Sequence, residues 1–64
     1  MELLTINETA ARLAIGRTKL WELATRDPDF PKPVSVTGRR KAFVKSEIDG
    51  WIAARIAERD GEAA

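Results

Sequence analysis

The chain opens with a short amphipathic segment. Ala10 and Leu13 fall on one face of a helix over residues 8–14, three residues apart. Thr5 or Asn7 precedes this segment and can accept a main-chain N–H as its N-cap. The pattern predicts a first helix of about two turns that buries one narrow face.

A second amphipathic segment follows almost at once. Residues 14–16 read Ala-Ile-Gly and predict a tight turn. In residues 17–25, Leu20, Leu23 and Ala24 recur at the spacing i, i+3, i+4, which is typical of a helix with one buried face. The sequence therefore predicts two short helices joined by a turn.

The middle of the chain changes from helical to extended patterning. The Asp-Pro pair at residues 27–28 ends the second helix, and the prolines within residues 31–33 forbid another. Residues 34–36 alternate like a strand, residues 37–38 supply a turn, and residues 41–44 return. The pattern predicts a two-stranded β-hairpin.

One feature of the returning strand stays open. Lys41 has the same parity as Phe43, so both side chains would point to one face of the hairpin. Either the strand contains a bulge or Lys41 lies beyond the edge of the core.

A third helix begins near Ser46, which reads as its N-cap, and ends at about Arg59. Its apolar residues share one face: Ile48, Trp51, Ile52 and Ile56. This face either covers the core or continues into a dimer seam. We expect a domain over residues 1–60 and a frayed tail over residues 61–64.

The chain has 64 residues, which predicts one small domain with one core. It has no cysteine and no histidine, so we expect no structural zinc site, and a Ser–His or Cys–His nucleophile is excluded. A chain this short has little room for a supported catalytic pocket. We expect neither an enzyme nor a bound metal or cofactor.

Charge is unevenly distributed along the chain. Residues 17–45 carry eight Lys and Arg against three Asp and Glu, a net charge of +5, whereas residues 46–64 carry two against five, a net charge of −3. The basic middle indicates a polyanionic partner. The longest apolar run, residues 51–54, is far too short to span a membrane, so we expect a cytoplasmic, nucleoid-associated protein and no membrane partner.

The order helix, turn, helix, hairpin, helix is that of a winged helix-turn-helix. The fold class expected is mostly α with a small two-stranded β-hairpin (α+β). In that layout the second helix enters the major groove, and basic residues of the hairpin neutralise phosphates or enter a minor groove. The candidate DNA-binding residues are Arg17, Thr18, Lys19, Trp21, Glu22, Lys32, Arg39, Arg40 and Lys41.

Three sequence segments resemble a known family. They are RTKLW at residues 17–21, FPKPV at 30–34 and SEIDGWI at 46–52. In this order and spacing the chain resembles the AlpA-type prophage regulators, relatives of small phage excisionases with a MerR-like winged fold. The resemblance implies DNA binding by a small transcription regulator or recombination directionality factor of a mobile element. It also implies that Phe43, Ile48 and Trp51 belong to the core.

Two residues depart from the family pattern. The family often has glycine where this chain has Ala14, and a left-handed conformation there would cost about 1–2 kcal/mol. It also favours tyrosine at the position of Trp21, which here either packs between helix and wing or contacts DNA.

The sequence leaves the biological role open between regulator and excisionase. An excisionase would also contact an integrase. A small DNA-binding surface further predicts cooperative self-association on DNA, as a dimer or filament. The rival hypothesis is a protein-interaction module that docks through the apolar last helix or the basic hairpin.

Overall fold

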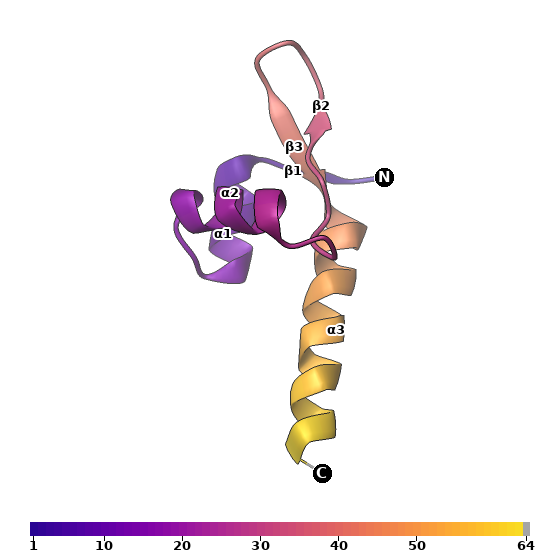
Figure 1. The fold of residues 1–64 in the computed structure, drawn as a ribbon. Coiled ribbons are helices and arrows are strands. Elements are labelled where there is room, and N and C mark those ends of the chain that lie inside the picture. Colours follow the sequence, from indigo (N-terminus) through magenta and orange to yellow (C-terminus); the bar gives the residue numbers. More distant parts are fainter. Residues whose placement is uncertain (64) are drawn as a thin grey trace.

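The computed structural model describes residues 1–63 and contains three helices and three strands (Figure 1). In chain order the elements are β1 (Leu3–Leu4), α1 (Ile6–Leu13), α2 (Arg17–Arg26), β2 (Val34–Ser35), β3 (Lys41–Val44) and α3 (Lys45–Ala63). The fold is mostly α with a small β part and is consistent with a winged helix-turn-helix. The fold class predicted from the sequence is therefore confirmed.

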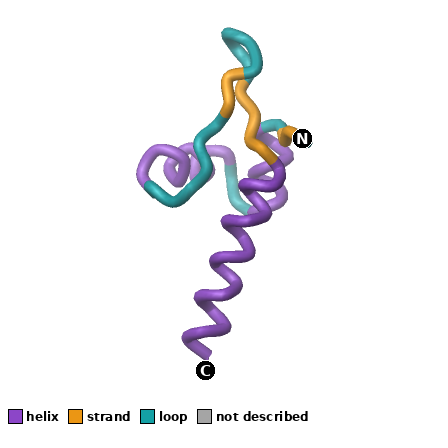
Figure 2. Tube along the Cα trace, turned by 90° about the vertical axis from the view of Figure 1, so that its right-hand side faces the viewer, coloured by secondary structure: helices purple, strands orange, loops and turns teal. Residues whose placement is uncertain are grey.

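The sheet has three strands, not the two predicted. The strands are ordered β1-β3-β2 and all pairs are antiparallel, so β3 is central (Figure 2). Leu3 lies opposite Val44 and Leu4 opposite Phe43. The two leucines escape sequence-based prediction because a strand of two residues has no alternation to detect.

The hairpin partner of β3 is β2. Val34 pairs with Ala42 and Ser35 with Lys41, so the register is continuous through the paired residues. Lys41 is exposed, whereas Phe43 is fully buried. Of the two alternatives for Lys41, the structure therefore has the one without a bulge, in which Lys41 lies beyond the edge of the core.

Thr5, not Asn7, is the N-cap of α1. The Thr5 hydroxyl accepts a hydrogen bond of 3.0 Å from the Glu8 main-chain N–H, and the Thr5 N–H donates one of 2.8 Å to Glu8 Oε1. This capping box starts α1 at Ile6, two residues before the predicted start. Hydrogen bonding to Thr5 lowers the pKa of the Glu8 carboxyl below its usual value. The main-chain N–H of Thr5 contributes most to this pKa shift, and the Thr5 side chain contributes less.

The turn between α1 and α2 depends on a left-handed alanine. Ala14 has φ 58° and ψ 41°, and it alone among the described non-glycine residues has a positive φ. Its N–H donates to the carbonyl of Ala11 at 3.1 Å, and the Ile15 N–H donates to that of Ala10 at 3.0 Å. These two bonds form the Schellman pattern that usually has glycine at the left-handed position.

The core lies between the sheet and the three helices. Its buried members are Leu4, Ala10, Leu20, Ala24, Phe30, Phe43 and Ile48. Phe30 is 1% exposed and packs edge-on against Phe43, at 5.8 Å between ring centroids, and against Trp51, at 5.0 Å. Trp51 is partly buried against this cluster. The core positions expected for Phe43, Ile48 and Trp51 are confirmed, whereas the core position of Phe30 is not among the sequence-based expectations.

The last helix differs from its prediction at both ends. It begins at Lys45, so Ser46 lies inside its first turn and is not the N-cap. Lys45 follows β3 directly, and its N–H donates to the Glu2 carbonyl at 2.9 Å, which carries the β1–β3 pairing into the first turn. The helix continues to Ala63, beyond the predicted end near Arg59, and Ala64 lies outside the described residues. The division into a domain (1–60) and a frayed tail (61–64) stays a prediction.

The molecule is elongated, with extents of 45 × 25 × 20 Å. The hairpin and the far end of α3 lie at opposite ends, and the last turns of α3 run clear of the other elements (Figures 1 and 2). Within residues 1–63, no helix combines the length and apolar character needed to cross a membrane.

Candidate nucleic-acid interface

The first turn of α2 exposes Arg17, Thr18 and Lys19. Gly16 is the N-cap, and it makes no side-chain hydrogen bond to the helix. The first turn contains no acidic residue to complement the positive end of the helix dipole. This end of α2 is thus rich in positive potential and in hydrogen-bond donors that lack an intrahelical partner.

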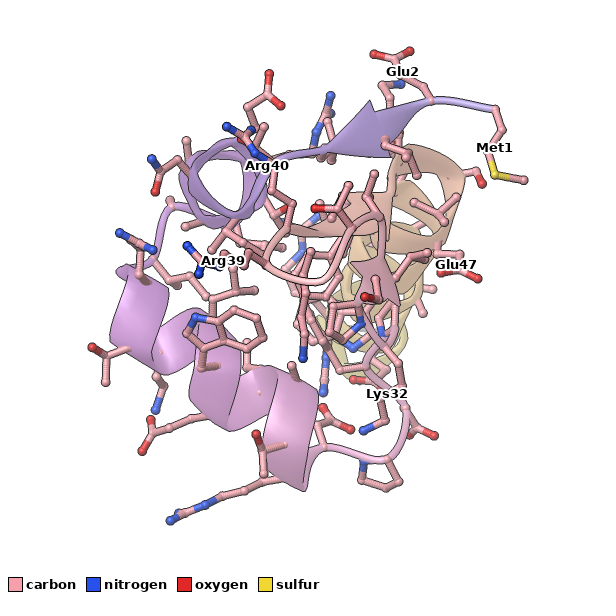
Figure 3. All side chains as sticks on the ribbon, turned by 90° about the horizontal axis from the view of Figure 1, so that it is seen from above. Met1, Glu2, Lys32, Arg39, Arg40 and Glu47 are labelled. Carbon is pink, nitrogen blue, oxygen red and sulfur yellow. The ribbon has the colours of Figure 1, made fainter. Side chains whose placement is uncertain are left out.

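The hairpin ends in a compact tip. The Val36 N–H donates to the Arg40 carbonyl at 2.9 Å, and the Arg40 N–H donates to the Thr37 carbonyl at 3.2 Å. The Ser35 hydroxyl adds a 3.2 Å bond to the same Thr37 carbonyl. Arg39 and Arg40 extend from this tip toward α1 and α2 (Figure 3).

A cleft of about 220 Å³ separates the hairpin from the two helices. We call it the basic groove; its lining residues are Thr5, Ile6, Asn7, Arg17, Arg39, Arg40 and Lys41. The groove joins the start of α1, the start of α2 and the wing. The structure therefore brings Arg17 together with a hairpin cluster more than twenty residues away in sequence.

The four basic side chains of the basic groove, unlike most other basic side chains of the protein, are not paired with carboxylates of the described residues. Ion pairs with carboxylates involve five basic residues, namely Arg12, Lys19, Lys45, Arg55 and Arg59. In the part of the chain that the structure describes, Arg17, Arg39, Arg40 and Lys41 make no ion pair, and no carboxylate lines the groove. The groove is a concentration of uncompensated positive charge, which attracts a polyanion.

Other predicted contact residues lie along α2. Lys19 forms an exposed ion pair of 3.5 Å with Glu22, three residues on, which is worth little in water. Trp21 is half-buried, with its ring centroid 6.5 Å from that of Phe43. Its packing against the core is established, and a DNA contact from its exposed edge stays a prediction.

Lys32 lies apart from the wing cations Arg39 and Arg40 (Figure 3). Its ammonium group donates a hydrogen bond of 2.8 Å to the Ala24 carbonyl near the end of α2. A phosphate contact by Lys32 stays a prediction, and it would compete with this bond.

Two further residues of the groove, Thr5 and Asn7, are not among the predicted contacts. The sequence presents both only as candidate helix caps. Because Thr5 caps α1, Asn7 stands in the first turn with an exposed amide on the rim of the basic groove. Its polar type is the only signal in the sequence, since the groove exists only once the wing folds over α1.

Similarity to known proteins agrees with this arrangement of helices and wing. The family model described as prophage CP4-57 regulatory protein (AlpA) matches residues 2–56. The chain belongs to the AlpA family of prophage regulators. The match covers both helices of the helix-turn-helix, the wing and the first part of α3.

An AlpA-family assignment also agrees with a curated relative of phage origin. The chain is 36% identical over 56 residues to the uncharacterized protein ORF88 of Enterobacteria phage P4. This match covers 88% of the present chain and 62% of the phage protein, so the chain spans less than two thirds of that relative. No solved structure matches the chain. The predicted resemblance to prophage regulators is confirmed.

Proposed function

We propose that this AlpA-family chain is a sequence-specific double-stranded DNA-binding protein, acting as a transcription regulator or an excisionase and not as an enzyme. The single observation that carries the proposal is the basic groove. Four cations without carboxylate partners converge there from two separate elements, the start of α2 and the wing. Such unpaired charge is favourable mainly when phosphates neutralise it. From DNA binding we further propose a cytoplasmic, nucleoid-associated location.

In this proposal α2 enters the major groove with its N-terminal turn. Arg17 and Lys19 then reach guanine O6 and N7, and Thr18 contacts a base edge or a thymine methyl. Glu22, one turn further, can accept a hydrogen bond from a cytosine amino group once its ion pair with Lys19 opens. Base contacts of this kind provide sequence discrimination.

The wing supplies affinity. Arg39, Arg40 and Lys41 are exposed, and they neutralise phosphates or enter a narrow minor groove beside the helix. Their contacts carry little sequence information, because phosphates are the same in every sequence. The two contact types therefore predict different outcomes when residues of each are replaced.

The decisive experiment is a fluorescence anisotropy titration of a labelled random-sequence duplex at several salt concentrations. We expect log affinity to fall with log salt at a slope of about −0.9 for each phosphate neutralised. The double variant Arg39→Ala/Arg40→Ala should lose affinity on all sequences and show a slope shallower by about 2. Arg59→Ala is the matched control, because Arg59 lies on α3, distant from the basic groove, and pairs with Asp60.

Arg17 is tested on a site obtained by in vitro selection. Arg17→Ala should change the preferred sequence and cost about 1–3 kcal/mol at one base pair. An equal loss on every sequence would contradict its role in base reading and assign it to the backbone.

We further propose cooperative self-association on DNA, as a dimer or short filament. A single module of this size buries about 600–1,000 Å² on DNA, which limits its affinity alone. Titrations on duplexes with one and two selected sites should show tighter binding per site on the longer duplex. A footprint confined to one site, with no cooperativity, would contradict this proposal.

The excisionase role requires an integrase as a further partner. Binding of the purified integrase of the same element, with and without DNA, would distinguish it from a regulator.

An adaptor role is the second candidate, and one surface favours it. An apolar cleft of about 330 Å³ runs between α1 and α3, and it is lined by Leu13, Trp51, Ile52 and Ile56 with three arginines. Ile56 is 45% exposed there. Absence of duplex binding even at low salt would make this surface, or the basic hairpin, the functional one.

A further inference from the structure

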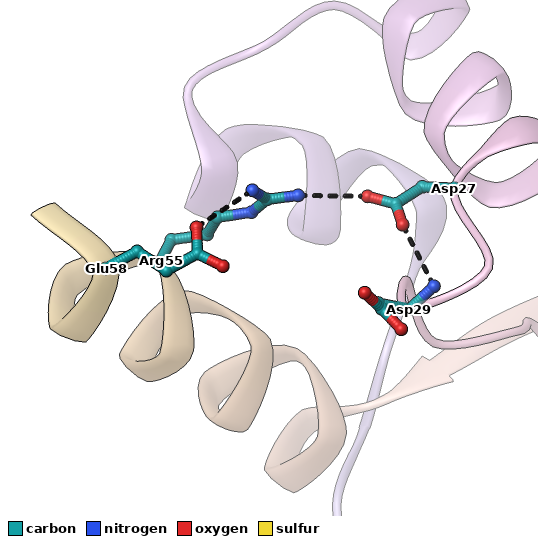
Figure 4. Close-up of polar contacts among 4 residues, drawn as sticks. All are labelled: Asp27, Asp29, Arg55 and Glu58. Atoms are coloured by element: carbon teal, nitrogen blue, oxygen red, sulfur yellow. Dashed lines mark hydrogen bonds and ion pairs between the residues drawn. The ribbon is translucent and has the colours of Figure 1, made fainter.

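Helix α3 is joined to both helices of the helix-turn-helix by ion pairs. Arg12 of α1 lies 3.3 Å from Asp49 of α3, and Arg55 of α3 lies 3.1 Å from Asp27, the C-cap of α2. The remaining ion pairs between described residues join positions no more than four apart in sequence. The Arg55–Asp27 pair is thus the long-range ionic link between the end of α2 and the rest of the fold (Figure 4).

The Asp27 carboxylate is fixed at the end of α2. The Asp27 N–H donates to the Leu23 carbonyl at 3.0 Å, which closes the last turn of the helix. Asp27 Oδ1 accepts a hydrogen bond of 2.9 Å from the Asp29 N–H, while Oδ2 accepts one of 3.1 Å from Arg55 Nη2. Only 18% of this side chain is exposed, against 49% of the Arg55 side chain, so it is the carboxylate half of the pair that is shielded from solvent.

Arg55 is held on its own side by two further contacts. Its guanidinium lies 4.8 Å from the centroid of the Trp51 ring, and Nη1 lies 3.2 Å from a Glu58 carboxylate oxygen. Trp51 in turn packs edge-on against the buried ring of Phe30. A guanidinium stacked and paired in this way is already ordered before it meets Asp27, which lowers the entropic cost of the link.

The opposite end of α2 packs through Leu20, which is fully buried, but among the described residues it makes no ion pair with another element. Gly16 caps it without a side-chain hydrogen bond, and its first turn faces the basic groove. A helix of 10 residues is about 15 Å long, so a tilt of about 5° at one end moves the other by about 1 Å. The Arg55–Asp27 pair therefore restricts tilting of α2 about its buried residues Leu20 and Ala24, and so contributes to the position of Arg17 and Lys19.

From these contacts we propose that Arg55 is a positioning residue for DNA recognition, which fixes the orientation of α2 through Asp27. This inference rests on the proposed DNA-binding function. Arg55 lines the cleft between α1 and α3 and is absent from the basic groove, so it acts on DNA only through α2. Loss of the Arg55–Asp27 pair lets the N-terminal turn of α2 move, while the wing and its phosphate contacts stay in place.

The test compares two single variants, Arg55→Gln and Asp27→Asn, with the double variant and with Arg59→Gln. The glutamine keeps an aliphatic stem over Trp51, and the asparagine keeps an oxygen for the Asp29 N–H. Arg59→Gln is the matched control, because Arg59 lies one turn further along α3 and, among the residues whose side chains the structure describes, pairs with Asp60. Affinities are measured for a selected duplex and a random duplex at several salt concentrations.

We expect each single variant to lower the ratio of specific to random affinity about threefold to tenfold. The double variant should be no worse than either single variant, since both remove the same link. The salt slope should equal that of the wild type, because no phosphate contact is lost, and Arg59→Gln should leave all values unchanged. A specificity ratio unchanged in Arg55→Gln would overturn the proposal.

A second measurement does not depend on DNA. Residual dipolar couplings of main-chain N–H groups report the orientation of α2 relative to α3 in the free protein. Arg55→Gln should change or broaden that orientation, and Arg59→Gln should not. If the wild type binds no duplex, the proposed function fails. Couplings of α2 identical in wild type and Arg55→Gln would refute the positioning role itself.

Discussion

The ammonium group of Lys32 lies 2.8 Å from the carbonyl oxygen of Ala24 and donates a hydrogen bond to it. Ala24 is in the last turn of α2, where main-chain carbonyls lack partners within the helix. Lys32 is carried there by a segment with proline on either side, which keeps the chain extended. A lysine that the sequence presents as a candidate phosphate contact thus satisfies a main-chain carbonyl at the end of α2.

Replacing Lys32 by methionine keeps the length of the side chain and removes the donor. We expect Lys32→Met to lower the free energy of unfolding by about 1 kcal/mol, because a partly buried carbonyl loses a charged partner. Urea denaturation measures this loss. Lys19→Met, at an exposed ion pair, is the control and should change stability by less than about 0.5 kcal/mol. A salt slope on DNA shallower by about 1 in Lys32→Met would establish a phosphate contact as well.

Replacing Ala14 by glycine should stabilise the protein. Ala14 is held at φ 58°, where a Cβ is strained by about 1–2 kcal/mol, and glycine removes that strain at some entropic cost. We expect Ala14→Gly to raise the free energy of unfolding by about 0.5–1 kcal/mol. Thermal denaturation measures this change, and Ala11→Gly is the matched control. Ala11 is an ordinary helical position in α1, so glycine there should destabilise by about 1 kcal/mol.

The capping box makes part of the stability dependent on pH. Hydrogen bonds from Thr5 hold the pKa of Glu8 below its usual value, and the charge of Arg12 adds to this effect. A lowered pKa in the folded state means that the contribution is present above the unfolded pKa and is lost as pH falls through the folded pKa. Urea denaturation between about pH 5 and pH 3 should show a steeper loss for the wild type than for Glu8→Gln. Equal slopes would show that the Thr5–Glu8 bonds do not persist in solution.

Phe30 should be the residue whose truncation costs most. It is 1% exposed and touches the rings of both Phe43 and Trp51. Phe30→Ala should cost about 3–5 kcal/mol, which is comparable with the whole stability of a domain of this size. Circular dichroism should then show loss of helix at room temperature, whereas Phe30→Leu should stay folded with a lower midpoint. Val36→Ala, at an exposed position, should have little effect.

The helices of the helix-turn-helix can be predicted from the sequence because their apolar residues recur at helical spacing. Leu20 and Ala24 are buried as the pattern requires. Phe30 carries no such signal, since it stands between prolines in a segment without periodicity. Its burial depends on Trp51 and Phe43, which reach it from other elements.

The individual residues of the candidate site can be predicted from the sequence, but the groove that brings them together cannot. Charge clustering in the sequence is enough to indicate Arg17 and the hairpin cations as contact residues. That they share one groove with Asn7 depends on how far the wing folds over α1, which is a tertiary relationship. The prediction of Ser46 as a cap is wrong because, although a serine before acidic residues is a common helix start, this helix begins directly from β3 at Lys45.

The place of β3 limits how the wing can move. This strand pairs with β1 on one side and β2 on the other, and Phe43 anchors it in the core. The second strand of the hairpin is thus also the central strand of the sheet, so the hairpin cannot rotate independently of the core. If the wing adjusts to DNA grooves of different width, the movement would be confined to the five residues between β2 and β3, at the tip of the hairpin. Amide hydrogen exchange along the hairpin should therefore fall sharply from Arg40 to Phe43.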